Sequence, residues 1–450
     1  MDFQVVVLAG GTSSGLAPLV SKEVPKALLP VANRPVLSYV LEQLELSNFK
    51  DVIVLVEGEE AALRVGSWIS SSYVDRLRVE VEMVPEDVGT AGALRSINHL
   101  LTAKDILVIS GDLVSDVPLG AVAATHRKQD AAITAMFCPS PVSGVAESGT
   151  STVKDKVKKP KCYNIIGLDA TKKFLLYVAT GVDVEKDIQI RKNILRAFGQ
   201  MELRADFMDA HLYAFNRSIL QEILNEKDKF QSLRQDVLPY LVSTQLKQNI
   251  SVNGGGHIDE NGHDKSSVIN NQAVVAQIHD FYASKLGSSV LGKETNKCCV
   301  YMASSKNYCA RLNSIQAYHD INRDVIGDAS HLSGYTFSAQ NNIIDSSVQL
   351  GSKSTVGPHC MVAEGSQLNE KCSIKRSVIG RHCRIGSNVK IVNSVVMNYV
   401  TIGDGCSVQN SVVCSNAQLQ ERVTIKDCQV GSGFVVAAGG DHKGESLAKK

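Results

Sequence analysis

The stretch VVVLAGGTSSGLAPLVSKEVPKALLPVANRP, residues 5–35, decides the fold of the first half of the chain. It predicts a buried strand that runs into a glycine-rich loop, the arrangement that holds phosphate groups at the end of a parallel sheet. A P-loop needs a lysine directly after its last glycine, and a dinucleotide loop needs the spacing G-x-G-x-x-G. The stretch has neither. The loop is therefore a nucleotide site of another kind, or what remains of one.

The chain around this stretch alternates short apolar runs with helical patterns as far as residue 243. In the first helical pattern, Val36, Val40, Leu41 and Leu44 follow the 3.6-residue period. The same reasoning predicts strands at residues 3–9, 51–56, 76–84 and 105–110, and helices at residues 35–49, 59–69 and 91–101. This alternation predicts an α/β fold with a doubly wound, mostly parallel sheet that binds ligands at the carboxyl ends of its strands.

The last third of the chain is a repeat. Aliphatic residues recur every six positions from Ile344 to Ile374, and then in steps of six, six and five as far as Val430. A second ladder has the same 17-residue interval: Ser377, Ser394, Ser411 and Cys428. Hexapeptide periodicity sustained over this length is typical of a left-handed parallel β-helix.

These patterns divide the chain into five parts. We predict an α/β domain at 1–246, a flexible linker at 247–273, a connecting segment at 274–330, a β-helix at 331–436 and a charged tail at 437–450. The linker is rich in Gly, Asn, Asp and Ser, a composition too polar to repay the entropy of ordering. His257 and His263 lie there without a cysteine or a rigid element beside them, so we predict no metal site. The basic run at 154–161 is interpreted as a solvated loop.

Composition excludes several classes of function. The chain has 47 Lys and Arg against 46 Asp and Glu, so no net field attracts nucleic acid or a membrane surface. Its 11 cysteines include no C-x-x-C pair, which indicates reduced thiols in a reducing compartment. The sequence shows neither a signal peptide nor a long apolar span. We expect a cytosolic protein without a cofactor and without direct contact with nucleic acid or membrane.

Four motifs, in this order, resemble those of the sugar-nucleotide pyrophosphorylase family. They are the glycine loop with its P-K motif, VGTAGALR at 88–95, GD at 111–112 and AHLYAFNRSIL at 210–220. The resemblance covers residues 1–246, and a β-helix behind this domain is also typical of the family. It implies a nucleotide site at these residues: Gly10, Gly11, Lys26, Gly89, Thr90, Gly92 and Asp112.

The sequence also departs from this family. Family members clamp the phosphates with a loop arginine, a lysine of the P-K motif and two aspartates that hold Mg²⁺. Lys26 and Asp112 match the lysine and the first aspartate, but Gly15 stands at the arginine position. The E-K-P motif that holds the sugar phosphate is missing, and only Asp259 and Asp264 follow where a second aspartate is expected. We therefore predict no catalytic residue and at most residual nucleotide binding.

Each matched residue also has a purely structural interpretation. Gly10 and Gly11 would serve a turn that needs positive φ, and Asp112 would bond loop amides. Lys26 would be a surface cation. The sequence leaves these alternatives open.

Further segments resemble the gamma subunits of eukaryotic translation initiation factor 2B, a guanine-nucleotide exchange factor. They lie at residues 233–242, 297–325 and 373–413. This resemblance implies a non-catalytic scaffold or regulatory subunit in a hetero-oligomer. Such a subunit pairs with the catalytic epsilon subunit and the other subunits, and it supports GDP-to-GTP exchange on translation initiation factor 2.

Two other classes stay open. One is an active GDP-mannose or glucose-1-phosphate pyrophosphorylase, against which the missing arginine and E-K-P motif argue. The other is a hexapeptide acyltransferase, which would need a catalytic histidine at a coil corner, such as His359 or His382.

The outward positions of the β-helix suggest an interface, because the neighbours of an inward residue in a strand point outward. Two outward ladders are polar: Arg384, Thr401 and Gln418 in one, and Lys390, Ser407 and Thr424 in the other. The third, here called the apolar stripe, consists of Val378, Val395, Met397, Val412 and Cys414. An apolar stripe left in water usually marks an interface, so we expect the matching β-helix of an epsilon subunit to dock there. The alternative is that residues 274–325 of the chain itself cover the stripe.

Overall fold

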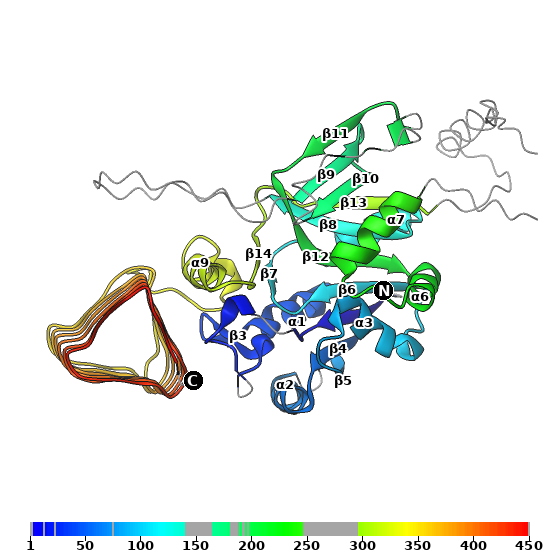
Figure 1. The fold of residues 1–450 in the computed structure, drawn as a ribbon. Helices are drawn as coiled ribbons and strands as arrows, with labels where there is room; N and C mark the ends of the chain where they lie inside the picture. The colour runs from blue at the N-terminus through cyan, green and yellow to red at the C-terminus, as the bar shows by residue number, and fades with distance from the viewer. Residues whose placement is uncertain are drawn as a thin grey trace, which may run out of the picture.

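The computed structural model shows an α/β domain beside a triangular β-helix (Figure 1). It describes residues 3–11, 14–21, 24–73, 76–139, 164–180, 188, 190, 194–195, 198–245 and 296–448. The predicted linker at 247–273, with His257, His263, Asp259 and Asp264, lies outside these residues, as does the basic run at 154–161.

The described part of the α/β domain is built on a seven-stranded sheet in the order β13-β8-β12-β6-β1-β4-β5. Only β12 runs antiparallel to its neighbours, so the sheet is mostly parallel, as predicted. The strands are β1 (Phe3–Leu8), β4 (Asp51–Glu57), β5 (Arg78–Val84), β6 (Asp105–Ser110), β8 (Ile133–Pro139), β12 (Phe207–Asn216) and β13 (Cys298–Met302). The position of β13 shows that the predicted connecting segment at 274–330 is wrong, because part of it belongs to the sheet of the first domain. The apolar run CCVYM pairs in parallel with β8 and completes the first domain.

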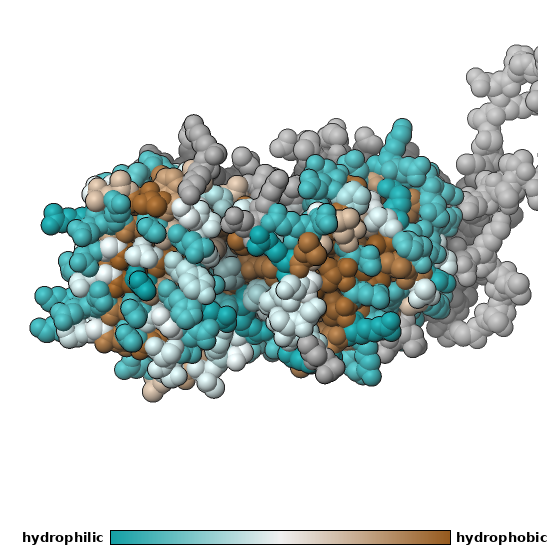
Figure 2. Space-filling model, turned by 90° about the horizontal axis from the view of Figure 1, so that it is seen from below, coloured by the Kyte–Doolittle hydropathy of each residue, from teal (hydrophilic) through white to brown (hydrophobic). Residues whose placement is uncertain are grey.

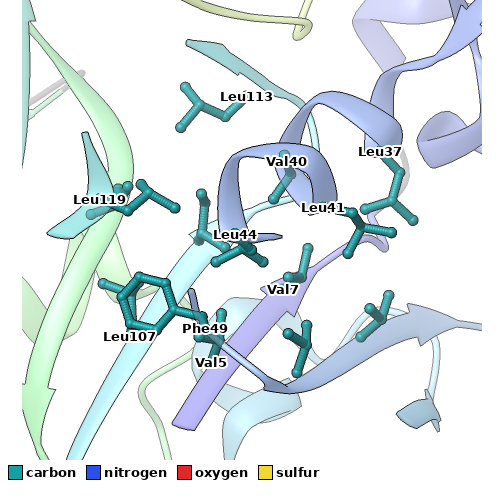
Figure 3. Close-up of a cluster of buried hydrophobic side chains, with 14 of the residues drawn as sticks. Val5, Val7, Leu37, Val40, Leu41, Leu44, Phe49, Leu107, Leu113 and Leu119 are labelled. Carbon is teal, nitrogen blue, oxygen red and sulfur yellow. The ribbon is translucent and has the colours of Figure 1, made fainter. Parts of the chain in front are cut away.

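Helices cover both faces of this sheet, which confirms the doubly wound arrangement. One face buries side chains of α1 (Val36–Leu46), α2 (Glu59–Ser72) and α4 (Leu119–Gln129). The other buries side chains of α3 (Gly89–Ser96), α6 (Arg217–Glu226) and α7 (Leu238–Thr244). In Figure 3, Leu37, Val40, Leu41 and Leu44 of α1 lie over Val5 and Val7 of β1 and Leu107 of β6. This contact follows from the 3.6-residue spacing of α1, which gathers its apolar side chains on one side.

Smaller elements complete the domain. A three-stranded sheet has the order β10-β9-β11, and β14 pairs in antiparallel fashion with β7. These strands are β7 (Leu113–Ser115), β9 (Asn164–Asp169), β10 (Leu175–Thr180), β11 (Met201–Arg204) and β14 (Cys309–Arg311), with a hairpin of β2 (Pro30–Val31) and β3 (Arg34–Pro35). The remaining helical segments are η1 (Ser14–Leu16), η2 (Lys26–Leu28), η3 (Asn98–Leu100), η5 (Leu233–Val237), α9 (Ile315–Val325) and η7 (Ser330–Leu332). No helix of the described residues combines the length and apolar content needed to cross a bilayer.

The C-terminal unit is a left-handed parallel β-helix with three flat sheets. The first contains β15 (Ile343–Ile344), β18 (Met361–Val362), β21 (Val378–Ile379), β24 (Val395–Val396), β27 (Val412–Val413), β30 (Gln429–Val430) and β33 (Ser446–Leu447). The second contains β16 (Gln349–Leu350), β19 (Gln367–Leu368), β22 (Arg384–Ile385), β25 (Thr401–Ile402), β28 (Gln418–Leu419) and β31 (Val435–Val436). The third contains β17 (Thr355–Val356), β20 (Ser373–Lys375), β23 (Lys390–Val392), β26 (Ser407–Gln409), β29 (Thr424–Lys426) and β32 (Asp441–Lys443).

The predicted register of the repeat is confirmed, but both predicted boundaries of the β-helix differ from those in the structure. The aliphatic residue of most strands is buried in the interior, and Ser377, Ser394 and Ser411 form a buried ladder of hydrogen bonds. The first strand begins at Ile343, later than the predicted start at 331. The predicted charged tail at 437–450 is wrong for its described part, because β32 and β33 add another turn. This last coil is polar and is held by backbone pairing with the preceding coil. Its polar composition therefore gave no sign in the sequence that the β-helix continues.

The prediction of a partner on the apolar stripe is wrong. Val378, Val395, Met397, Val412 and Cys414 are each no more than 5% exposed. They share one hydrophobic cluster with Tyr318, Ile321 and Val325 of α9 and with Leu16, Leu19, Leu29, Val31, Val36 and Tyr39 of the α/β domain. The alternative is therefore correct, because the chain covers the stripe itself through α9. Arg384, Thr401 and Gln418 on the second sheet are exposed, as predicted.

Other apolar side chains remain at the surface. Leu63 of α2 is 68% exposed and Met83 of the edge strand β5 is 55% exposed. Figure 2 shows apolar side chains gathered on this side of the α/β domain, in the region of α2 and β5.

Candidate nucleotide site

The glycine loop lies at the carboxyl ends of β1 and β6, where an α/β sheet binds ligands. Both loop glycines have a local structural reason. A Cβ atom at Gly10 would lie 2.9 Å from the backbone nitrogen of Glu57, so only glycine allows this close approach. Gly11 has a φ of +110°, which other residues rarely adopt. These two glycines are thus explained by the turn alone.

Lys26 and Asp112 come together as the family resemblance implies. The Nζ atom of Lys26, at the start of η2, lies 2.5 Å from Oδ2 of Asp112. The carboxylate also accepts a hydrogen bond at 2.6 Å from the hydroxyl of Ser110. The side chain of Asp112 is 4% exposed and that of Lys26 is 14% exposed. Lys26 is therefore no surface cation, and side chains hold both carboxylate oxygens of Asp112.

A second cation that the sequence did not indicate completes this cluster. Arg311 donates from Nε to Oδ1 of Asp112 at 3.0 Å and from an Nη to Oδ2 at 3.1 Å, a bidentate pair. The same Nη donates to the Ser110 hydroxyl at 3.2 Å. Arg311 ends β14, which pairs with β7 directly after Asp112. The next amide, of Leu312, donates to the backbone carbonyl of Asp112 at 3.0 Å.

The two cations fix the ionisation of Asp112. Burial by itself would raise the pKa of this carboxyl group. The charges of Arg311 and Lys26, with hydrogen bonds from Lys26 and Ser110, outweigh burial and hold the pKa far below its usual range. Asp112 is thus a carboxylate at physiological pH, and two largely buried cations already contact it.

The nearby buried carboxylate is Asp209 of β12. Its Oδ2 accepts a hydrogen bond from the Tyr213 hydroxyl at 2.6 Å, and its Oδ1 accepts one from the backbone nitrogen of His211 at 2.8 Å. His211 has a φ of +54°, and its Nε2 is buried without a hydrogen-bond partner. Burial, aided by the charge of Arg311, lowers the pKa of His211 to about 4, so the ring is neutral.

These residues do not fit the Mg²⁺ that the family resemblance implies. Mg²⁺ requires free carboxylate oxygens and space for water ligands in an octahedral shell. Both oxygens of Asp112 are engaged by cations, and both oxygens of Asp209 accept hydrogen bonds from neighbouring groups. Nowhere in the described ranges do three or more His, Cys, Asp or Glu side chains group so that they could hold a metal ion.

The space beside the cluster is also small. The cleft between the glycine loop, Lys26 and Asp112 leaves about 10 Å³, room for no more than one water molecule. A phosphate group does not fit there unless the surrounding side chains move.

The arginine position of the loop faces the segment that carries Arg311. A Cβ atom on Gly15 would lie 3.1 Å from the backbone carbonyl oxygen of Asn313. The neighbouring residues Leu16 and Leu19 are buried in the cluster between the two domains. In this chain the loop therefore contributes to domain packing.

The VGTAGALR motif at 88–95 lies apart from Lys26 and Asp112. Gly89 begins α3 with a φ of +68°, and a Cβ atom there would lie 2.4 Å from the carbonyl oxygen of Gln231. The hydroxyl of Thr90 accepts a hydrogen bond from the Leu233 amide at 2.9 Å, and Gly92 packs against Val88. None of these three predicted residues lines the cleft beside Asp112.

The two histidines of the acyltransferase alternative are held at coil corners. The Nδ1 atom of His359 lies 3.4 Å from the carbonyl oxygen of Ile326. The ring of His382 stacks on Tyr399 with a centroid distance of 5.3 Å. Both contacts serve packing between neighbouring segments.

Sequence reasoning missed Arg311 and Asp209. Arg311 is 199 positions from Asp112, and no motif around it marks it. Asp209 had a weak signal, because it is an acidic residue in the apolar strand that begins the AHLY motif. Only the antiparallel pairing of β12 with β6 shows that this strand adjoins the one that leads to Asp112.

Comparison with known proteins gives matches over both domains. The nucleotidyl transferase family matches residues 4–256, and the family described as the eIF2B subunit epsilon LbH domain matches residues 339–440. The chain is 29% identical to translation initiation factor eIF2B subunit gamma of Dictyostelium discoideum, over 84% of this chain and 87% of that one. It is also 29% identical to the subunit of the same name in Schizosaccharomyces pombe, over 83% and 74%. Similarity to mannose-1-phosphate guanyltransferase of Yarrowia lipolytica, at 28% identity, covers only 34% of this chain and 44% of that enzyme.

Proposed function

This chain belongs to the nucleotidyl transferase family, and from that premise we propose that it acts as a gamma-type subunit of translation initiation factor 2B. The observation that carries the proposal is the extent of the similarity. The two gamma subunits match more than four fifths of the chain, whereas the guanyltransferase matches about a third of it. The match of residues 339–440 to the eIF2B epsilon LbH family supports an eIF2B subunit, and the gamma assignment rests on the two relatives over the whole chain.

We further propose that the chain is not a catalyst and uses no cofactor. One sequence feature and two contacts support this. Gly15 replaces the loop arginine, and Asp112 is paired with both Lys26 and Arg311. Loss of one group that stabilises a leaving pyrophosphate costs on the order of 10³ in rate. A site that has also lost access to its carboxylate should be slower still.

As a subunit, the chain would pair with the epsilon subunit and the other subunits in the cytosol and support GDP-to-GTP exchange on translation initiation factor 2. We propose that the chain makes no direct contact with nucleic acid or membrane. Because α9 covers the apolar stripe, the partner must contact another surface. The exposed apolar side chains Leu63 and Met83 on α2 and β5 are where we place a contact with another subunit.

Three measurements test this function. The purified chain should release no pyrophosphate from GTP or ATP with mannose-1-phosphate or glucose-1-phosphate, and millimolar nucleotide should leave its melting temperature unchanged. The tagged chain should copurify with an epsilon subunit when the two are coexpressed. Turnover on the order of 1 s⁻¹ would instead favour an active pyrophosphorylase. Failure to copurify, in a chain shown to be folded, would contradict the subunit assignment.

The surface is tested by a matched pair of variants. Leu63→Asp together with Met83→Asp should abolish copurification and leave the melting temperature of the isolated chain nearly unchanged, because both side chains are already exposed. Thr401→Asp, on the exposed second sheet of the β-helix, is the control and should copurify normally. Normal copurification of the double variant would place the contact elsewhere.

A further inference from the structure

We propose that the guanidinium of Arg311 takes the place of a divalent cation at Asp112, so that this cation site is filled by the chain itself. This role of the Arg311 side chain does not depend on the complex to which the subunit belongs.

The geometry around Asp112 is that of a filled cation site. Arg311 engages both carboxylate oxygens, at 3.0 and 3.1 Å, and so uses the planar fork that suits a carboxylate. Lys26 adds a third contact to the same carboxylate. Arg311 is also largely buried, with 12% of its side chain exposed, so water does not screen the pair strongly.

The charge balance of the cluster opposes the entry of a further cation. Asp112 carries one negative charge against the positive charges of Lys26 and Arg311, which leaves one net positive charge. A divalent ion would have to displace one of these cations, because the buried cluster has no net negative charge to neutralise it. Counting the nearby carboxylate Asp209 brings the sum only to zero, so the cluster still has no net negative charge, and both oxygens of Asp209 already accept hydrogen bonds.

Arg311 is also held in place by its backbone. Arg311 pairs with Leu113 across β14 and β7, and the amide of Leu312 donates to the carbonyl of Asp112. The segment then continues to Ser314, whose side chain caps α9. Withdrawal of the guanidinium would leave Asp112 with Lys26 and Ser110 alone, and a swing of the whole segment would break β14 from β7.

The segment that carries Arg311 also links the two domains. The same short segment places Arg311 on the carboxylate and α9 on the apolar stripe. The ion pair therefore connects the carboxyl end of β6 to the helix on which the β-helix packs. The carboxylate that would have held a metal here ties the two domains together.

Binding of Mn²⁺ to the full-length chain tests the proposal, with free Mn²⁺ measured by electron paramagnetic resonance. The wild-type chain should bind no Mn²⁺ at the site up to millimolar concentration. Arg311→Ala and Arg311→Met, the latter preserving much of the side-chain volume, should each bind Mn²⁺ at least roughly tenfold more tightly than wild type. Adding Asp112→Asn to either variant should remove the gain. Arg323→Ala removes an exposed arginine of α9 that is paired with Asp320 and Asp324, and it should behave as wild type.

Two results would overturn the proposal. One is stoichiometric Mn²⁺ binding by the wild-type chain that Asp112→Asn abolishes, because the site would then be open to metal with Arg311 in place. The other is a folded Arg311 variant, judged by circular dichroism, that binds Mn²⁺ no better than wild type. If Arg311→Ala does not fold, Arg311→Met and the wild-type titration decide the question.

Discussion

Asn322 of α9 holds the backbone of Ala32 across the boundary between the two domains. Its Oδ1 accepts a hydrogen bond from the Ala32 amide at 2.9 Å, although the two residues are 290 positions apart. Its Nδ2 donates to the carbonyl of Tyr318 at 2.9 Å, and the side chain is 1% exposed. Ala32 lies in the β2–β3 turn with a φ of +45°. A single buried amide therefore fixes the PVANRP turn against α9.

Asn322→Leu should destabilise the protein by about 1–3 kcal/mol, because the Ala32 amide would be left buried without an acceptor. Denaturant unfolding followed by circular dichroism measures this. Gln316→Ala is the control, since Gln316 is an exposed residue of the same helix that bonds only Asp320. Equal stability of the Asn322 variant and wild type would show that the amide does not hold the turn.

Val395→Asp with Val412→Asp should unfold the isolated chain or lower its stability by at least about 3 kcal/mol, because each carboxylate would be buried without a partner. Thermal unfolding of the monomer provides the measurement. The matched control is Thr401→Asp on the exposed second sheet, which should change stability little. A stable double variant that merely loses a partner would restore the interface interpretation of the stripe.

Gly15→Arg should not create pyrophosphorylase activity. The new side chain would start 3.1 Å from the Asn313 carbonyl oxygen, and Asp112 would still be paired with Arg311. Release of pyrophosphate in the presence of Mg²⁺, nucleotide and sugar-1-phosphate is the assay, with Gly15→Ala as the control for backbone effects. Turnover approaching that of working enzymes, on the order of 1 s⁻¹, would show that the loop arginine alone was missing.

The protein should become less stable as the pH decreases, because His126 is buried in its neutral form. Its Nδ1 lies 3.0 Å from the Thr134 hydroxyl, and burial lowers its pKa to about 4 despite the opposing charge of Asp105. Asp130, Arg127 and Lys104 are the other charged groups that act on it. The unfolded chain binds the proton near pH 6.5 and the folded chain only near pH 4. The stability from the neutral ring is therefore complete above pH 6.5 and is lost as the pH falls toward 4, by up to about 1.4 kcal/mol per pH unit.

His126→Gln should flatten this pH dependence between pH 6.5 and 4, as measured by melting temperature against pH. The slope should shrink and not vanish, because the pKa of His211 is lowered in the same way. His99→Gln, at an exposed histidine, should retain the wild-type curve. An unchanged slope in the His126 variant would show that its ring does not control acid stability.

The site could be predicted only in part. Lys26 and Asp112 follow from motifs, and the structure brings them into contact. Gly89, Thr90 and Gly92 carry an equally good motif, yet Gly89 and Thr90 contact Gln231 and Leu233, Gly92 packs against Val88, and none of the three lines the cleft beside Asp112. Arg311 lies in a segment that resembles the gamma subunits, but nothing in that segment marks it as a partner of Asp112. A motif identifies residues that are close in sequence, whereas an ion pair between distant segments depends on the tertiary fold.

By itself, the sequence determined the elements whose signals are local and periodic. The 3.6-residue spacing of α1 and the 17-residue repeat of the β-helix each fix which side chains face inward, because a helix and a coil repeat their geometry at those intervals. The tertiary structure alone decided what covers the outward faces. The apolar stripe meets α9 and not a partner, and Asp112 meets Arg311 and not a metal ion, because the pairing of β14 with β7 places the segment that carries Arg311 and leads into α9. That pairing joins segments nearly 200 residues apart and leaves no period in the sequence from which it could be read.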